Sequence, residues 1–205
     1  MLNFTCFVDA SSYINLSLEE YNSGTLLDLL HQRVNVKYSP EVYSEINRHR
    51  NNNMPSQHSM ANKVYRTQKL NYDDYHDLFF KDSGRQNDIG EKENLISLVD
   101  KYLDNKVKGL VFLSDDVKAI DNILNEAIYS FPIFQVWSSF DVVLYLYIDH
   151  KLITKDMAES AIRDLNANMA TDDERMDPEK TQKRINIFQT YIDRLNFIHN
   201  IIGKL

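Results

Sequence analysis

Acidic side chains recur at four places in this chain, where a predicted strand ends or a predicted helix carries them. Carboxylates that converge at one edge of a sheet repel each other unless a divalent cation neutralises them, and oxygen-only ligands favour Mg²⁺ or Mn²⁺. Such a cation can activate a water and stabilise the leaving oxygen of a phosphodiester, so the pattern indicates metal-dependent hydrolysis. The four places are Asp9, Glu45, the pair Glu91 and Glu93, and the pair Asp115 and Asp116.

Helix and strand geometry restricts which of these carboxylates can share one site. Residues two apart on a regular helix point about 200° from each other, so Glu91 and Glu93 cannot both face it. We choose Glu93, because the apolar residues that follow place its helix firmly and because it lies in the first turn. Neighbours at a strand end point to opposite faces, so we choose Asp116, with Asp115 as a helix-cap alternative.

Asp9 has two competing explanations. It follows the apolar run from Leu2 to Val8, which is typical of a strand buried in a parallel sheet. Its carboxylate either caps the next helix, since aspartate is a favoured cap, or lies at the carboxyl end of the first strand, where ligands and metals gather. Capping alone leaves the other acidic places unexplained, so their joint occurrence favours a site.

Alternating strand and helix patterns predict an α/β fold with a central parallel sheet flanked by helices. Apolar runs predict strands at 2–8, 34–36, 109–113 and 132–137. Residues 26–30 are interpreted as the end of a first helix. Helical spacing predicts further helices at 40–46, 70–80, 93–103, 117–127, 140–147 and 154–165. The Asn-rich residues 47–63 are expected to form a long loop or a mobile helical arm.

An added C-terminal helix is the clearest amphipathic element. Asp177 and Pro178 cap it, and its apolar residues follow in steps of three or four that form one stripe. We therefore predict a domain at residues 1–170. At 171–205 we predict a linker and a helix that packs on that domain or on a partner.

The composition is that of a globular protein, since 43% of the 205 residues are apolar and 26% are charged. No run of about 18 apolar residues occurs, so we expect no membrane span. The N-terminus lacks the basic and apolar start of a signal peptide, and the single cysteine, Cys6, lies in an apolar strand. These features predict a cytoplasmic protein without disulfides.

Charge is distributed unevenly along the chain, although the net charge is −7. Between residues 31 and 70, seven Lys and Arg stand against two Glu, so this window carries 7 − 2 = +5. Such a segment presents either a phosphate-facing patch or a solvated helical face. The residues that we expect to guide a phosphate backbone are Arg48, Arg50, Lys63 and Arg66.

Four short motifs resemble, in order and spacing, those of the PIN domain family of Mg²⁺/Mn²⁺-dependent ribonucleases, over roughly residues 2 to 165. They are Asp-Ala-Ser-Ser-Tyr-Ile-Asn-Leu at 9–16, Pro-Glu-Val-Tyr-Ser-Glu-Ile at 40–46, Gly-Glu-Lys-Glu-Asn-Leu at 90–95 and Leu-Ser-Asp-Asp-Val-Lys-Ala at 113–119. Ala10 stands where the family usually has Thr, and the glycine-rich turn before the late helix is missing.

The resemblance implies a three-layer PIN-like sandwich that cleaves single-stranded RNA with Mg²⁺ or Mn²⁺. The carboxylates that would bind the metal and carry catalysis are Asp9, Glu45, Glu93 and Asp116. Ser11, Glu91 and Asp115 would support that cluster. Proteins of this family are often toxins held by an antitoxin and usually form dimers, so an antitoxin and a second copy are implied partners. The alternative is a catalytically silent PIN-like module that serves a protein partner.

Overall fold

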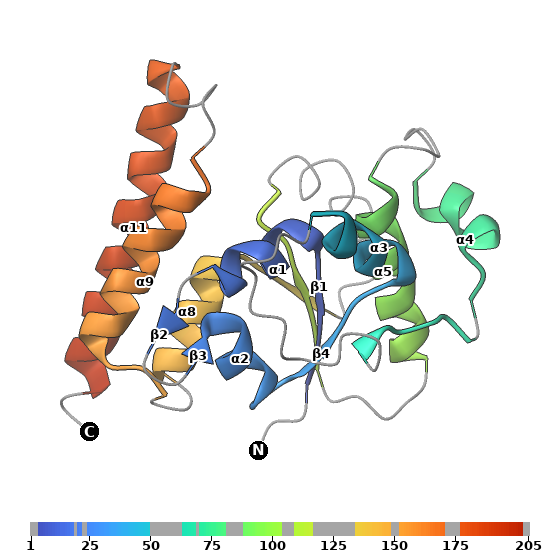
Figure 1. Cartoon of the computed structure of the whole chain (residues 1–205), viewed down its shortest axis with the longest axis horizontal. Coiled ribbons are helices and arrows are strands. Elements are labelled where there is room, and N and C mark those ends of the chain that lie inside the picture. Colours follow the sequence, from blue (N-terminus) through green and yellow to red (C-terminus); the bar gives the residue numbers. More distant parts are fainter. Residues whose placement is uncertain are drawn as a thin grey trace. The chain divides into compact units, whose positions relative to one another are not determined.

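The computed structural model describes most of the chain, and Figure 1 shows its helices and strands. The described residues are 4–18, 20–21, 24–49, 63–68, 70–80, 88–103, 109–116, 134–148, 152–170 and 177–202. Unit 1 of the fold holds Met1–Ile14 and Leu30–Ser138, and unit 2 holds Asn15–Leu29 and Ser139–Leu205. The predicted boundary between residues 170 and 171 therefore falls within unit 2. The predicted helix at 117–127 and most of the Asn-rich stretch lie outside the described residues.

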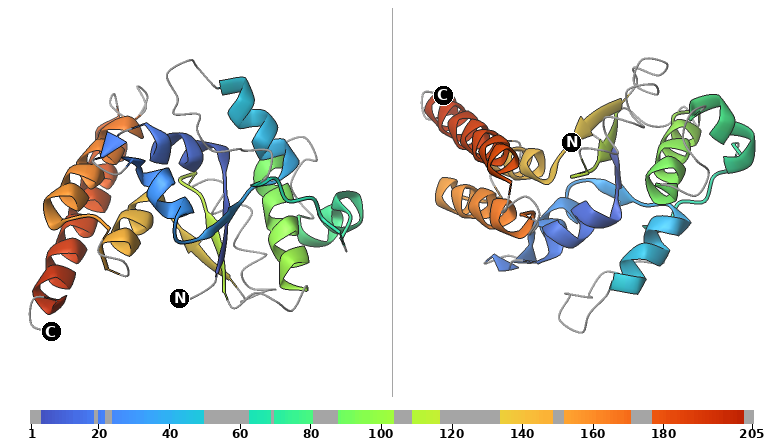
Figure 2. Two further views of the ribbon diagram at one scale, coloured as in Figure 1. Left: turned by 60° about the horizontal axis from the view of Figure 1, so that its bottom comes forward. Right: turned by 90° about the horizontal axis from the view of Figure 1, so that it is seen from above.

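Unit 1 is built on a four-stranded parallel sheet with the strand order β4-β1-β5-β6 (Figure 2). Its strands are β1 (Thr5–Val8), β4 (Asn35–Lys37), β5 (Leu110–Leu113) and β6 (Phe134–Trp137). Every residue of the two central strands, β1 and β5, is buried, which explains why their sequences are apolar on both faces. A mixed α/β fold with a central parallel sheet flanked by helices is confirmed.

Helix α5 (Ile89–Tyr102) packs on this sheet and supplies much of the core of unit 1. It also contacts α3 (Pro40–His49) and α4 (Tyr72–Phe79). The Ser39 Oγ accepts a hydrogen bond from the Val42 N–H at 3.3 Å, so the predicted start of α3 is confirmed. The buried cluster between α5 and the sheet includes Phe7, Phe112, Leu95, Ile96 and Leu98.

Asp100 of α5 is a buried carboxylate that holds the chain leading to α4. One of its oxygens accepts hydrogen bonds from the Tyr65 hydroxyl at 2.7 Å and from the Gln68 N–H at 3.1 Å. The other accepts the Leu70 N–H at 2.8 Å. A buried charge is tolerated where several donors satisfy it, and these three donors come from one segment.

Replacing Asp100 by alanine is expected to lower the free energy of unfolding by about 2–4 kcal/mol, because its donors lose a buried charged acceptor. Urea unfolding followed by circular dichroism would measure the loss. Asp100→Asn retains one carbonyl oxygen and should lose about half as much. A loss below about 0.5 kcal/mol in the alanine variant is typical of surface sites and would contradict this structural role.

Unit 2 is mainly helical, and α9 packs against both α8 and α11 in it. These helices are α8 (Ser139–Ile148), α9 (Lys155–Asn168) and α11 (Pro178–Ile202). The Thr154 Oγ accepts the Met157 N–H at 3.2 Å and so caps α9. Asp177 Oδ1 accepts the Glu179 N–H at 3.0 Å, so the predicted cap of α11 is confirmed. Among the described residues, no helix has the length and apolar character needed to cross a membrane.

The prediction that residues 26–30 end the first helix is wrong. That helix, α1 (Ala10–Ser17), stops well before them. A short antiparallel pair follows, formed by β2 (Glu20–Tyr21) and β3 (Gly24–Thr25). Residues 26–30 then belong to a separate helix, α2 (Leu26–His31).

Local backbone chemistry explains why a new helix starts there. Gly24 has a φ of 115°, a conformation that residues with side chains rarely adopt. The Asp28 Oδ2 accepts the Thr25 N–H at 3.0 Å, while the Thr25 Oγ accepts the Asp28 N–H at 3.1 Å. This reciprocal pair is a capping box, which a reading of apolar spacing alone does not reveal.

Candidate functional site

Asp9 lies at the carboxyl end of β1 and directly before α1. It therefore both caps the helix and lies at the edge of the sheet. Its Oδ1 accepts the Ser12 N–H at 2.6 Å, which is the bond of a helix cap. Its Oδ2 accepts the hydroxyls of Ser11 at 3.1 Å and of Ser114, at the end of β5, at 2.5 Å. The Asp9 N–H also donates to the Leu113 carbonyl at 3.0 Å, which extends the strand pairing to the site.

The Asp9 carboxyl is completely buried, with 0% of its surface exposed. Its pKa is raised from 3.8 to about 7, first by burial and then by the negative charge of Asp115. Hydrogen bonds from Ser114 and Ser12 act in the opposite direction. No Lys, Arg or His of the described ranges forms an ion pair with it. A buried carboxylate with a strongly raised pKa and no cation beside it marks a candidate functional group.

Glu91, in the first turn of α5, is coupled to carboxylates on other elements. Its pKa is raised to about 7, mainly by burial, although a hydrogen bond from its own backbone lowers it. The negative charges that add to the raised pKa are those of Glu45, Asp88 and Asp116. Carboxylates from α3, α5 and the end of β5 therefore share one electrostatic environment.

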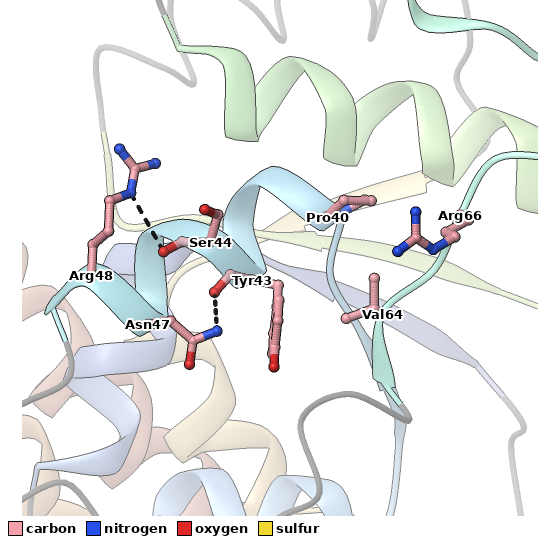
Figure 3. A pocket seen from close by; sticks show the side chains of 7 residues that line it. All are labelled: Pro40, Tyr43, Ser44, Asn47, Arg48, Val64 and Arg66. Atoms are coloured by element: carbon pink, nitrogen blue, oxygen red, sulfur yellow. Dashed lines mark hydrogen bonds between the residues drawn. The ribbon is translucent and has the colours of Figure 1, made fainter.

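Glu45, on α3, lies in the same environment and is half-buried. Burial is the largest cause of its raised pKa, and neighbouring negative charges add to it. These are the charges of Glu41, Asp9 and Glu93. The Arg48 guanidinium opposes them and lowers the pKa. Arg48 follows one turn later on α3, where its Nε donates to the Ser44 carbonyl at 3.4 Å (Figure 3).

Gly90 allows α3 and α5 to approach closely beside Glu45. A Cβ atom at position 90 would lie 3.0 Å from Glu45 Oε2 and 3.1 Å from Val42 Cγ2, both closer than nearly all real contacts of a Cβ. The glycine in the third motif is therefore part of α5, which begins at Ile89. Because Gly90 has no side chain, the Glu45 carboxylate has room to lie against α5.

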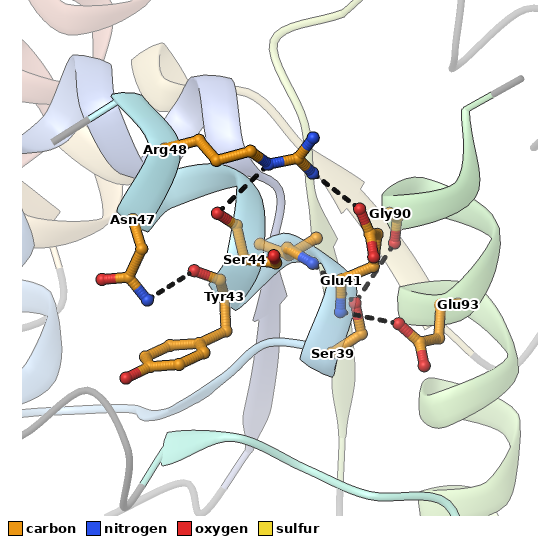
Figure 4. Close-up of polar contacts among 9 residues, drawn as sticks. Ser39, Glu41, Tyr43, Ser44, Asn47, Arg48, Gly90 and Glu93 are labelled. Atoms are coloured by element: carbon orange, nitrogen blue, oxygen red, sulfur yellow. Dashed lines mark hydrogen bonds and ion pairs between the residues drawn. The ribbon is translucent and has the colours of Figure 1, made fainter.

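Glu93 serves the start of α3, as Figure 4 shows. Its Oε2 accepts the Glu41 N–H at 2.8 Å, one of the amides that a helix N-terminus leaves without an intrahelical partner. The prediction that Glu93 lies in the first turn is wrong, because α5 begins at Ile89 and its first-turn acid is Glu91. Of this pair, Glu91 is coupled to Asp116, while Glu93 is held by α3.

Asn94 joins three elements of the site through one buried side chain. Its Oδ1 accepts the Ser39 N–H at 2.7 Å, and its Nδ2 donates to the Val8 carbonyl at 2.9 Å. Val8 directly precedes Asp9, and Ser39 directly precedes α3. One amide on α5 therefore positions both of the elements that carry the neighbouring carboxylates.

Asp115 and Asp116 follow β5 and act on different carboxylates. Asp115 is half-buried and raises the pKa of Asp9, whereas Asp116 is exposed and raises the pKa of Glu91. The Asp116 N–H donates to the Ser114 Oγ at 3.2 Å, so the same hydroxyl serves the turn and Asp9. The helix that Asp115 was predicted to cap lies outside the described residues.

A metal ion suits this site in its donor chemistry. Carboxylate oxygens are the ligands that Mg²⁺ and Mn²⁺ prefer, and a divalent cation would relieve the repulsion that contributes to the raised pKa values. Within the described ranges, however, no group of three or more His, Cys, Asp or Glu side chains is arranged to hold a metal ion. As the structure describes them, Asp9, Glu45 and Glu91 are therefore not gathered around one ion position.

The basic residues predicted to guide RNA are only partly brought together. Arg48 and Arg66 both line a pocket of about 580 Å³ beside α3. The Arg48 Nη2 also lies 2.7 Å from Glu41 Oε1, which links the pocket to the acidic side of the helix (Figure 4). Lys63 lies outside the pocket lining, and Arg50 lies outside the described residues.

Two residues of the site, Ser114 and Asn94, were not found from the sequence. Ser114 stands directly after β5, as Asp9 stands after β1. Polar residues at the ends of neighbouring parallel strands meet at one edge, and this was the signal available for Ser114. For Asn94 the signal was a polar residue inside the apolar stretch of a buried helix.

Comparison with known proteins does not place this chain in a family. No protein-family model matches it, and neither the curated proteins nor the solved structures give a significant match. The functional conclusion therefore depends on the residues of the site and their chemistry.

Proposed function

We propose that this protein is a PIN-like nuclease that uses Mg²⁺ or Mn²⁺ to hydrolyse phosphodiester bonds of single-stranded RNA. The observation that carries the proposal is the Asp9 carboxyl, fully buried at the end of a central parallel strand with a pKa of about 7. Glu45 is coupled to Asp9, and Glu91 to Glu45, so three elements contribute charge to one edge of the sheet. Ligands of open α/β sheets bind at this edge.

The residues that would hold the cation are Asp9, Glu45, Glu91 and Asp116. When bound, a divalent cation supplies an activated water and stabilises the leaving oxygen. The hydroxyls of Ser11 and Ser114 and the Ser12 N–H orient both oxygens of Asp9. In the metal-free chain Glu91, with a pKa of about 7, can hold a proton on its carboxyl group or release it near neutral pH.

Cleavage of labelled single-stranded RNA is expected to require Mn²⁺ or Mg²⁺ and to stop in EDTA. An ion that binds only the folded state stabilises it, by about 2.7 kcal/mol at a hundred times its Kd, so Mn²⁺ should also raise the melting temperature. Glu159→Gln is a control, because Glu159 pairs with Arg163 on the surface of unit 2 and should leave both results unchanged. Cutting that persists in EDTA would contradict the proposal, as would the absence of both cutting and Mn²⁺ binding by calorimetry.

A second role, as a protein-interaction module, is supported by the surface of α11. Of the side chains that the structure describes on this helix, only Ile192 and Leu195 are buried. The large apolar side chains that it exposes are Ile185, Ile187, Ile201 and Phe197, the last with 66% of its surface. At about 100° per residue, Ile187, Phe197 and Ile201 lie on one side of the helix, and an antitoxin or a second copy of the chain would cover such a face. Because this role needs no carboxylate cluster, a chain that neither binds Mn²⁺ nor cuts RNA would leave it as the supported function.

A further inference from the structure

The pocket beside α3 lies on the face of the helix next to the one that carries Glu45. Pro40, Tyr43 and Asn47 follow in steps of three and four, so they share one face of α3 and line the pocket together. Val64 and Arg66 line it from a separate segment (Figure 3). At about 580 Å³ the pocket is within the size range of small-molecule sites.

The lining of this pocket has an apolar part and a cationic part. Pro40, Val64 and the ring of Tyr43 form the apolar part. The Tyr43 ring is parallel to the Tyr38 ring within 5°, with centroids 6.3 Å apart, an offset arrangement that helps to hold its plane. The cationic part consists of two guanidinium groups. A flat ring combined with guanidinium groups is how proteins hold the base and the phosphate of an unpaired nucleotide.

The two arginines differ in how their charge is engaged. The Arg48 guanidinium forms an ion pair with the Glu41 carboxylate at 2.7 Å and lies next to the acidic side of α3. For Arg66, none of the described carboxylates lies within ion-pair distance, so its charge remains available to a phosphate. The pocket is therefore positive at its margin and adjoins the carboxylate cluster through Arg48.

We infer that this pocket is a subsite for one unstacked nucleotide of a single-stranded RNA, with its base on Tyr43 and its phosphate at Arg48 and Arg66. The inference rests on the nuclease function proposed above and specifies its substrate. A duplex keeps its bases stacked and paired, so a pocket that accepts one base selects single strands. An acidic peptide could use the guanidinium groups but has no flat base to stack on Tyr43.

Fluorescence anisotropy of a labelled single-stranded RNA in EDTA would measure this subsite without catalysis. Arg66→Met is expected to weaken binding severalfold and to reduce the slope of log K against log salt by about 0.7, the value for one phosphate contact on a single strand. Tyr43→Leu keeps an apolar side chain without a ring and should weaken binding about 5- to 100-fold at an unchanged slope. Melting curves would confirm that each variant folds.

A matched pair of arginines provides the control. Arg48 and Arg163 are 61% and 58% exposed, and each lies 2.7 Å from a glutamate oxygen. Arg48→Met is expected to weaken RNA binding severalfold, whereas Arg163→Met should leave it unchanged. An equal loss in both variants would assign the effect to net charge and overturn the subsite.

Further outcomes separate this inference from the proposed function. Wild-type affinity in both Arg66→Met and Tyr43→Leu would overturn the subsite, even if Mn²⁺-dependent cutting of RNA were found. Competition by polyglutamate as strong as that by unlabelled RNA would overturn it in favour of an acidic protein partner. If these variants selectively lost RNA binding while the wild-type chain cut no RNA with any metal ion, the nucleotide pocket would be supported. The same result would overturn the proposed nuclease function.

Discussion

Replacement of Asp9 by asparagine is expected to stabilise the protein in EDTA above pH 7 and, in the same variant, to slow metal-dependent cutting of RNA roughly 100-fold. The pKa of Asp9 is raised from 3.8 to about 7 in the folded state, so the folded chain keeps a proton that the unfolded chain releases between these values. The free energy of unfolding therefore falls as the pH rises through this window. At about 1.4 kcal/mol per pKa unit, the penalty above pH 7 is at most roughly 4 kcal/mol.

Asparagine at position 9 would remove that penalty and keep the shape of the side chain. Its amide can still bond to the hydroxyls of Ser11 and Ser114, which either donate or accept. We expect a gain of about 1–3 kcal/mol at about pH 8, or several degrees in melting temperature, and little gain at about pH 4. Calorimetry in EDTA at both pH values would measure this difference.

Asp177→Asn is the matched control for stability. Asp177 also caps a helix, through the Glu179 N–H, but its side chain is 41% exposed and so carries little desolvation penalty. No gain is expected at either pH. If Asp9→Asn were less stable than the wild type at both pH values, the ionised carboxylate would be satisfied by the protein alone, and the argument from burial would fail.

The loss of cutting in Asp9→Asn follows from the charge of the carboxylate. A neutral amide attracts a divalent cation far less, and a loss of about 2.7 kcal/mol corresponds to roughly 100-fold in rate. Single-turnover cleavage with Mn²⁺ would measure it. Undiminished cutting would remove Asp9 from the site, whatever its effect on stability.

Glu91→Gln and Glu93→Gln are expected to have opposite effects, although the two residues stand in the same motif. Glu91 has a pKa raised to about 7 by burial and by Glu45 and Asp116, so its neutral variant should cut RNA roughly 100-fold more slowly and lose no stability in EDTA. Glu93 holds the Glu41 N–H at the start of α3. Its neutral variant should keep most of the activity and lose about 0.5–1 kcal/mol of stability, because a negative charge favours a helix N-terminus.

The comparison of these two variants decides which glutamate belongs to the site. Cleavage rates and urea unfolding should be measured on both, with Glu159→Gln as the surface control. A large loss of cutting in Glu93→Gln, with activity retained in Glu91→Gln, would restore the assignment that the sequence favoured. Equal losses in both would mean that the carboxylates act as one coupled group.

The sheet and most helices could be predicted from the sequence because buried strands and buried helix faces consist of apolar residues. The central strands β1 and β5 are buried on both faces and are apolar throughout their inner residues. Caps such as Ser39, Thr154 and Asp177 lie at the helix starts where their chemistry predicts them. The place of Asp9 at a strand end follows from the same reasoning.

The choice between Glu91 and Glu93 could not be made from the sequence, because it depends on where α5 begins. The sequence predicts this helix at 93–103, which puts Glu93 in the first turn, whereas α5 begins at Ile89 and includes Gly90, which makes room for Glu45. A shift of the helix start changes which glutamate stands in the first turn. The pocket could not be predicted from the sequence either, because Tyr43 and Arg66 come from separate segments that only tertiary packing brings together.

The buried amide of Asn94 means that the backbone segments carrying the carboxylates are already held together in the folded protein without a ligand. Through the Ser39 N–H and the Val8 carbonyl, it holds elements that are far apart in the sequence on one support. The conformational entropy that a site on mobile loops would lose on binding has already been lost during folding. The cation proposed above would therefore bind without the entropic cost of ordering these backbone segments.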